Sequence, residues 1–243
     1  MSNVQGIPVV DRDCVVIRFA GDSGDGMQLT GSQFTSTSAV LGNDLATLPD
    51  FPAEIRAPAG TVAGVSGFQI QIGASEVFTP GDSPDVLVAM NPAALRYNIR
   101  DLTAGATVIL NRDSFDDRAY AKAGYDCDPL EDGSLDGYRV HEVPLTTLTR
   151  GALDGTDLSK KEKDRCKNLF ALGLTYWMYG RPMDHTVKWL EIKFAKKPEL
   201  VDANVRAMKA GYHFGETAGI FAESYRVSPA TIKPGLYRNI TGN

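Results

Sequence analysis

The sequence predicts an α/β protein: a Rossmann-like, doubly wound and mostly parallel sheet with helices on both faces and extra helices at the C-terminal end. Three observations predict it. Short apolar runs rich in β-branched residues alternate with helical stretches, a glycine-rich turn joins the first run to a helix, and the last third of the sequence is helical in pattern. With 243 residues, the chain is long enough for one large domain.

The first predicted unit is a strand, a tight turn and a helix. Residues 14–20, CVVIRFA, form an apolar run typical of a buried strand. The turn GDSGDG at 21–26 follows, and small and apolar residues over 27–41 predict the helix. Gln28 lies three residues after Asp25, which is the spacing of a capping box, so we expect Asp25 to cap this helix.

The region after this helix predicts a connection and a second strand. Residues 48–64 are rich in Pro, Gly and Ala, which bars a regular helix, so we expect a structured connection there. Residues 66–72 alternate apolar and polar side chains, as a half-solvated strand does. Residues 76–78 follow at the distance of a hairpin partner.

Strands and helices then alternate as they do in a parallel sheet. The continuous apolar run 85–90 predicts a central parallel strand, and residues 93–102 predict the helix after it. Two more strands are predicted at 107–110 and 138–143. Beyond them we expect only helices and a tail of little periodicity, with the helices at 160–179, 186–194 and 199–223 and the tail at 229–243.

The composition excludes several classes of protein. The apolar fraction of 43% and the charged fraction of 23% are those of an ordinary globular protein. A net charge of −5 argues against a nucleic-acid partner, and the main basic run, at 160–163, is interrupted by an acid and predicts a solvated helix start. No apolar stretch approaches the ~20 residues that cross a membrane, and the N-terminus lacks the pattern of a signal peptide.

The cysteines and histidines predict no metal site. Three cysteines lie far apart with no C-x-x-C pair, which fits a reducing cytoplasm and excludes a self-contained zinc or iron–sulfur centre. His141, His185 and His213 lack the spacing of metal ligands, so we interpret them as structural or surface residues. We also find no nucleophile elbow and no paired acid and base, and hence predict no catalytic residues in this chain.

The turn at 21–26 carries the main functional signal. Backbone N–H groups converge where a strand ends and a helix begins, and glycines let a phosphate or carboxylate approach them. The spacing here is G-x-x-G-x-G, which differs from the dinucleotide fingerprint G-x-G-x-x-G. The turn also holds two acids and no cation, so its pattern alone leaves a nucleotide site and a purely structural turn equally open.

Two asparagines are further candidates for the same site. Asn91 and Asn111 each end a predicted strand, at the edge where open α/β sheets bind ligands. Each could instead satisfy turn backbone. Arg56 is a candidate for an anion or an interface, with an ion pair to Glu54 as the alternative.

Several segments together resemble the γ module of 2-oxoacid:ferredoxin oxidoreductases, in the form that precedes the α module. The resemblance covers about residues 12–225, and the block FPAEIRAPAG at 51–60 is its most specific part and points to the 2-oxoglutarate branch. The other segments that carry it are AGDSGDGM at 20–27, VSG at 65–67, DVLVAMN at 85–91, KNLFALG at 167–173 and NVRAMKAG at 204–211. The sequence RNITGN at 238–243 resembles the opening of the α module. The resemblance therefore implies a γ-type domain over 1–225, a linker over 226–243, and a longer subunit of which this chain is a fragment.

The resemblance also implies a reaction and its cofactors. Enzymes of this family decarboxylate a 2-oxoacid on thiamine diphosphate with Mg²⁺, pass electrons through a 4Fe–4S cluster to ferredoxin, and form acyl-coenzyme A and CO₂. The diphosphate and the cluster belong to a partner β subunit, and the α module holds the pyrimidine, so a fragment of this kind is inactive alone. The γ-type domain helps to hold coenzyme A, which would here fall to Gly21, Asp22, Ser23, Gly24, Asp25, Gly26, Met27 and Gln28, with Asn91 and Asn111.

Two other functions remain open from the sequence. One is a docking domain that only stabilises the assembly. The other is a nicotinamide dehydrogenase domain, which the misplaced glycines and the missing proton-transfer residue disfavour. We expect a Cβ at Gly24 to crowd the turn, so that Gly24→Val would weaken coenzyme A binding more than folding.

Overall fold

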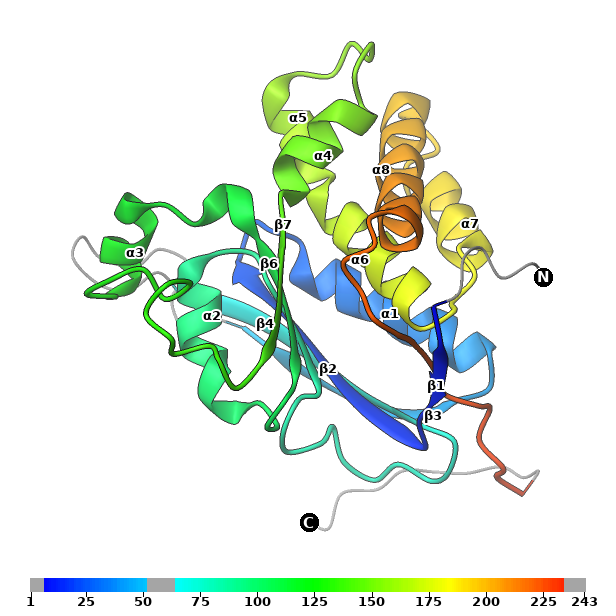
Figure 1. The fold of residues 1–243 in the computed structure, drawn as a ribbon. Helices are drawn as coiled ribbons and strands as arrows, with labels where there is room; N and C mark the ends of the chain where they lie inside the picture. Colours follow the sequence, from blue (N-terminus) through cyan, green and yellow to red (C-terminus); the bar gives the residue numbers. More distant parts are fainter. Residues whose placement is uncertain (1–6, 52–63, 234–243) are drawn as a thin grey trace.

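A six-stranded sheet forms the centre of the computed structural model, which describes residues 7–51 and 64–233. The strand order is β3-β4-β2-β5-β6-β7 (Figure 1). The strands are β2 (Cys14–Asp22), β3 (Asp44–Asp50), β4 (Val65–Gly73), β5 (Val86–Ala89), β6 (Thr107–Asn111) and β7 (Arg139–Val143). Strands β2, β5, β6 and β7 run parallel, whereas β4 is antiparallel to both β2 and β3. The predicted doubly wound, mostly parallel sheet is confirmed.

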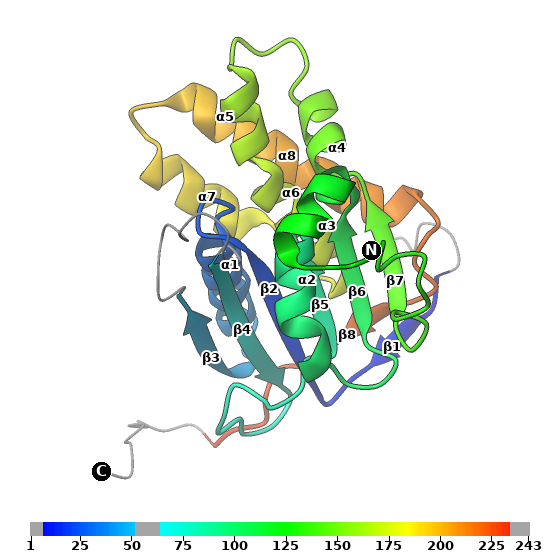
Figure 2. The same cartoon turned by 90° about the vertical axis from the view of Figure 1, so that its left-hand side faces the viewer.

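Helices cover both faces of this sheet, as predicted (Figure 2). On one face lie α1 (Met27–Val40), α6 (Lys167–Met178) and α8 (Pro198–Thr217), with α4 (Leu145–Ala152), α5 (Lys160–Arg165) and α7 (Asp184–Lys193) beyond them. On the other face lie α2 (Pro92–Asn98) and α3 (Asp117–Ala123), with short 3-10 turns at Ile99–Asp101 and Arg112–Ser114. None of the helices in the described ranges is long and apolar enough to span a membrane.

Strand alternation divides the buried apolar residues into two cores. On β2, Ile17 and Phe19 point into the larger core beneath α1 and α6, whereas Ala20 points into the smaller core beneath α2. Strands β5 and β6 are buried along their whole length because one core lies on each face of the sheet. The continuous apolar run at 85–90 is therefore a central parallel strand, as predicted, and the strand predicted at 107–110 pairs with it in parallel.

The antiparallel side of the sheet differs from the prediction. Strand β4 is almost wholly buried instead of half-solvated, because it lies between β3 and β2 and beneath α1. Its polar residue Gln69 is satisfied inside the protein by Arg18 and by two backbone carbonyls, which removes the need for water. The hairpin partner of β4 is β3, not residues 76–78, which form no strand.

Strand β3 occupies part of the region expected to be a connection. Residues 44–50 pair with β4 along the sheet edge, where Pro49 is tolerated because an edge strand leaves one side unpaired. Residues 52–63, which include Arg56, Glu54 and most of the block at 51–60, lie outside the described residues.

The C-terminal helices also depart from the prediction in detail. The helix expected over 160–179 is two helices, α5 and α6, separated at Cys166. The basic run at its start is solvated, as predicted, and a capping box between Ser159 and Glu162 begins α5. Helix α8 ends at Thr217, earlier than expected, and the chain then forms β8 (Ser224–Arg226), which pairs in parallel with β1 (Val9–Asp11).

Candidate functional site

The turn between β2 and α1 is closed by its own acid, Asp25. The backbone N–H of Asp25 donates to the carbonyl of Asp22 at 2.9 Å, and the backbone N–H of Asp22 donates to Asp25 Oδ2 at 2.9 Å. This reciprocal pair needs a small residue beside it, because a Cβ at Gly21 would lie 2.8 Å from Asp25 Oδ2. The carboxylate thus shapes the turn and does not cap the helix.

The predicted capping box is therefore wrong. The residue before the first turn of α1 is Gly26, in the left-handed region with φ 75°, and its position has no side-chain cap. Gln28 instead donates through Nε2 to the carbonyl of Gly67 at 2.7 Å and so ties α1 to β4. The sequence spacing fits a capping box, but the helix begins one residue later than this spacing requires, with Gly26 and not Asp25 at the N-cap.

Lys167 neutralises Asp25 from a distant part of the chain. Its Nζ lies 2.8 Å from Asp25 Oδ1, and both side chains are largely buried. Lys167 begins α6, whose next residue, Asn168, packs against Gly26. The acidic turn is thus anchored to a helix that supplies the cation that the turn itself lacks.

Asp22 and Asn91 meet across the end of the sheet. Asn91 Nδ2 donates to Asp22 Oδ1 at 2.9 Å, while Asn91 Oδ1 accepts from the backbone of Ala94 and caps α2. Burial and the neighbouring Asp25 raise the pKa of Asp22 above its ordinary value, against the opposing effect of Asn91. Part of this carboxyl group's charge is therefore uncompensated, and a donor or cation arriving from outside would stabilise it.

A pocket of about 230 Å³ opens at this edge. Asp22, Asp25 and Asn91 line it together with Lys122 on α3 and Lys167 on α6. Ser114 and the first residues of α2, Pro92 and Ala93, also line it. The carboxyl ends of β2, β5 and β6 meet here, which is where open α/β sheets place ligands.

The other candidate residues lie around the pocket without lining it. Met27 is buried in the larger core, and Gln28 points toward β4. Asn111 is fully buried and donates to Ser114 Oγ at 2.8 Å, so it positions a residue of the pocket wall. Gly21 lies in β2, Ser23 and Gly24 form the turn itself, and Gly26 precedes α1.

The glycines of the turn have different roles. Position 26 needs a glycine for two reasons: its φ is positive, and a Cβ there would overlap the amide of Asn168. Gly24 is different, since a Cβ there would have no neighbour within 4 Å. The expectation that the protein does not tolerate a Cβ at Gly24 is therefore wrong, because the turn leaves that position open.

Lys122 and Lys167 are site residues that the sequence reasoning missed. Neither is near the glycine turn in sequence, and only packing of α3 and α6 against the sheet edge brings them to it. The available signal was indirect: Lys167 begins one of the segments that resemble the γ module. Two lysines facing two aspartates give a pocket that can take an anion and a hydrogen-bond donor together.

The histidines take no part in this pocket. His141 packs its ring on Phe221 at 4.5 Å, and burial lowers its pKa below the ordinary value. Within the described ranges, no three His, Cys, Asp or Glu side chains gather in a way that could hold a metal ion. The pocket residues thus form a binding arrangement, with no nucleophile activated by a neighbouring base.

Comparison with known sequences identifies relatives of the whole domain. Residues 16–214 match the family described as pyruvate ferredoxin/flavodoxin oxidoreductase. The 2-oxoglutarate oxidoreductase subunit KorA of Mycobacterium tuberculosis is 59% identical over 229 residues, which are 94% of this chain. This chain spans only 35% of the length of that relative.

Comparison with solved structures gives the same fold. The 2-oxoglutarate:ferredoxin oxidoreductase of Magnetococcus marinus, solved with 2-oxoglutarate, coenzyme A and succinyl-CoA bound, matches 90% of this chain and 34% of its own at 23% identity and a TM-score of 0.69. Subunit PORC of the pyruvate oxidoreductase of Thermotoga maritima matches 83% of this chain and 97% of its own at 19% identity and a TM-score of 0.57.

Proposed function

The chain belongs to the pyruvate ferredoxin/flavodoxin oxidoreductase family, and from this premise we propose that it is the coenzyme A-associated γ-type domain of a 2-oxoglutarate:ferredoxin oxidoreductase. The observation that carries the proposal is the pocket at the carboxyl edge of the sheet, where Lys122 and Lys167 face Asp22 and Asp25. The high identity to the KorA subunit supports the choice of 2-oxoglutarate. The neighbour with bound coenzyme A supports the choice of ligand.

Lys122 is the residue on which phosphate binding would depend most. It lines the pocket and has no ion-pair partner among the described residues, whereas Lys167 is already committed to Asp25. Coenzyme A carries phosphates that need a cation and an adenine and amide groups that can donate to a carboxylate. Lys122 would meet a phosphate, while Asp22, whose charge is incompletely compensated, would accept from a donor.

A calorimetric titration of coenzyme A into the chain, run beside NAD, tests the proposal. We expect heat with coenzyme A and none with NAD. Lys122→Gln should weaken coenzyme A binding about ten-fold, the effect of losing one charge-assisted hydrogen bond. Lys193→Gln is the matched control, because Lys193 is a lysine on α7 that stacks on Trp189 and does not line the pocket.

The outcomes distinguish three functions. Binding of coenzyme A that Lys122→Gln weakens and Lys193→Gln leaves unchanged supports the proposal. Silence from both ligands contradicts it and favours a docking domain, an alternative supported by the turn's internal partners, Lys167 and Asn91. Binding of NAD with hydride transfer would favour a dehydrogenase domain.

The remaining cofactors would lie outside the described residues. Within the described ranges, no group of three His, Cys, Asp or Glu side chains could hold a metal ion. We propose that these groups belong to a β subunit and to an α module reached through residues 226–243, that ferredoxin accepts the electrons, and that acyl-coenzyme A and CO₂ are the products. The free cysteines Cys14, Cys127 and Cys166 support a reducing, cytoplasmic location.

A further inference from the structure

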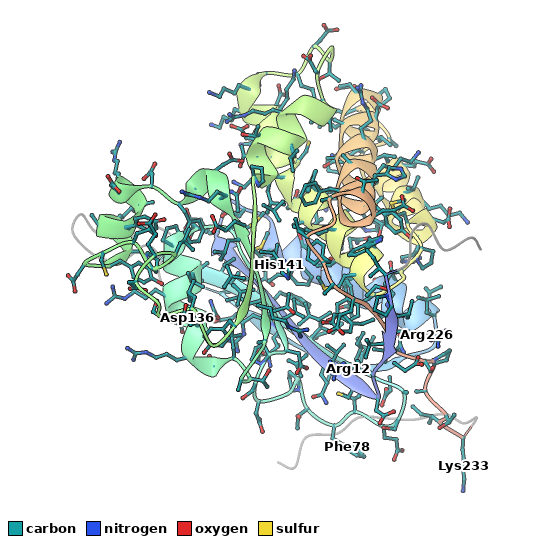
Figure 3. All side chains as sticks on the ribbon, in the orientation of Figure 1. Arg12, Phe78, Asp136, His141, Arg226 and Lys233 are labelled. Atoms are coloured by element: carbon teal, nitrogen blue, oxygen red, sulfur yellow. The ribbon has the colours of Figure 1, made fainter. Side chains whose placement is uncertain are left out.

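A second pocket lies at the opposite edge of the sheet from the glycine turn. It encloses about 250 Å³ where β2, β5, β6 and β7 begin. Its walls come from the starts of these strands, from the loop 103–106, and from Tyr179 and Tyr225, while Arg12 stands at its side near β1 (Figure 3). None of its residues lines the pocket that we assign to coenzyme A.

Arg12 brings a positive charge that the described residues leave unpaired. Its guanidinium lies over the ring of Tyr225, 5.5 Å from the centroid, and no carboxylate of those residues pairs with it. Arg139, on another wall, is held by Glu223 at 2.6 Å and by the carbonyl of Gly105. A ligand entering the pocket would thus meet one free guanidinium and one that is fixed in place.

Tyr179 gives the pocket a buried group that lacks a partner. Only 3% of this residue is exposed, and its hydroxyl makes no hydrogen bond, although buried hydroxyls almost always make one. The hydroxyl lies within electrostatic reach of Asp85 and Arg12, which both line the pocket. An occupant that hydrogen-bonds to this hydroxyl would satisfy it.

A third guanidinium, that of Arg181, lies within electrostatic reach of Tyr179. Arg181 is 4% exposed, and its Nε and Nη2 atoms have no hydrogen-bond partner. Burial lowers the pKa of Arg181 to about 10, so it remains charged at neutral pH. Among the side chains that line the pocket, the two guanidiniums of Arg12 and Arg139 face one carboxylate, that of Asp85, which leaves one positive charge in excess.

We propose that this pocket binds a small metabolite with one carboxylate and a second hydrogen-bonding group. The carboxylate would bind to the guanidinium of Arg12, whose parallel N–H donors match the two carboxylate oxygens. The second group would meet the hydroxyl of Tyr179. One excess positive charge fits a monocarboxylate better than a phosphate dianion, which Asp85 and Glu223 would repel.

Cys14 allows binding to be measured directly, because it is exposed and lines this pocket. Cys127 is also exposed but lies in the loop after α3, away from the pocket, and Cys166 is buried. We would alkylate the chain with iodoacetamide, with millimolar sodium lactate or with sodium chloride at equal ionic strength, and quantify each cysteine-containing peptide. Lactate should slow the alkylation of Cys14 and leave that of Cys127 unchanged.

Variants separate the site from a general salt effect. Arg12→Gln should weaken the protection of Cys14 by lactate about ten-fold, since it removes the charged partner. Tyr179→Phe should weaken it several-fold while keeping the ring contacts with Phe34 and Tyr225. Arg226→Gln is the matched control. Arg226 follows Tyr225 on β8 and pairs with Asp11, but it does not line the pocket.

Three results would overturn the proposal. Equal alkylation of Cys14 in lactate and in chloride would exclude the site, and so would protection that persists in Arg12→Gln. Stronger protection by inorganic phosphate than by lactate would contradict the choice of a monocarboxylate. Because coenzyme A should leave the alkylation of Cys14 unchanged, failure here and failure of the proposed function remain distinguishable.

Discussion

Replacement of Gly173 by alanine tests how closely α6 and α8 approach. A Cβ at Gly173 would overlap the carbonyl oxygen of Met208 and lie 2.8 Å from its carbonyl carbon. Gly211 makes the reciprocal approach, because a Cβ there would lie 2.8 Å from the carbonyl carbon of Phe170. Both obstacles are backbone atoms of a helix, so no side chain can turn aside to relieve the overlap.

The expected cost follows from this geometry. Carbon atoms pack best at about 3.5–4.0 Å, so the carbonyl carbon alone would require the two helices to separate by about 0.7 Å, and the nearer carbonyl oxygen requires a larger separation. Overpacking of a core costs about 1–3 kcal/mol, and a backbone obstacle places Gly173→Ala at the upper end. The higher helix propensity of alanine offsets about 0.5–1 kcal/mol of this cost. The free energy of unfolding should therefore fall by about 2 kcal/mol.

Urea unfolding followed by tryptophan fluorescence measures this loss, because both tryptophans, Trp177 on α6 and Trp189 on α7, pack against the larger core. Gly151→Ala is the matched control: Gly151 is on α4, and a Cβ there would have no neighbour within 4 Å. It should gain about 0.5–1 kcal/mol. If Gly173→Ala shifted the urea midpoint no more than Gly151→Ala does, the inferred backbone contact would be wrong.

The site offers two further tests. Gly26→Ala should lower the midpoint of thermal unfolding by the equivalent of about 1–3 kcal/mol because of its positive φ, whereas Gly24→Ala should change stability by less than about 0.5 kcal/mol. Asp22→Asn should stabilise the protein at neutral pH, because the folded state raises the pKa of Asp22 and thus holds its proton more tightly than the unfolded chain. Stability from this group is lost as pH rises through the folded pKa, so the gain should vanish below the ordinary value of 3.8; an equal gain at both pH values would contradict this assignment.

The strands were predictable wherever burial was two-sided. The runs at 14–20, 85–90 and 107–110 are apolar because α helices cover both faces, and a continuous apolar run shows this without knowledge of the fold. Strand β4 was harder because its buried Gln69 looks like a solvent-facing residue in sequence. Its actual partner is Arg18, on a strand that only the tertiary fold brings alongside.

The position of the site could be predicted from the sequence, but its two lysines and hence its charge could not. Strand ends mark the ligand edge of a parallel sheet, so Asp22 and Asn91 could be placed there from their positions after apolar runs. Lys122 and Lys167 reach the same edge through helices that begin far along the chain. No local pattern encodes that meeting, and the acidic turn therefore looked uncompensated.

The pairing of β1 with β8 has a mechanical consequence. Residues 9–11 and 224–226 run in parallel, side by side, one near each end of the described chain. Tension applied through the flanking segments would pull these strands in opposite directions along their length. The load would then fall on the ladder in shear, with its hydrogen bonds and the Arg226–Asp11 pair stretched together instead of one after another. A domain tethered at both ends within a larger assembly would resist being pulled open by the movements of its neighbours.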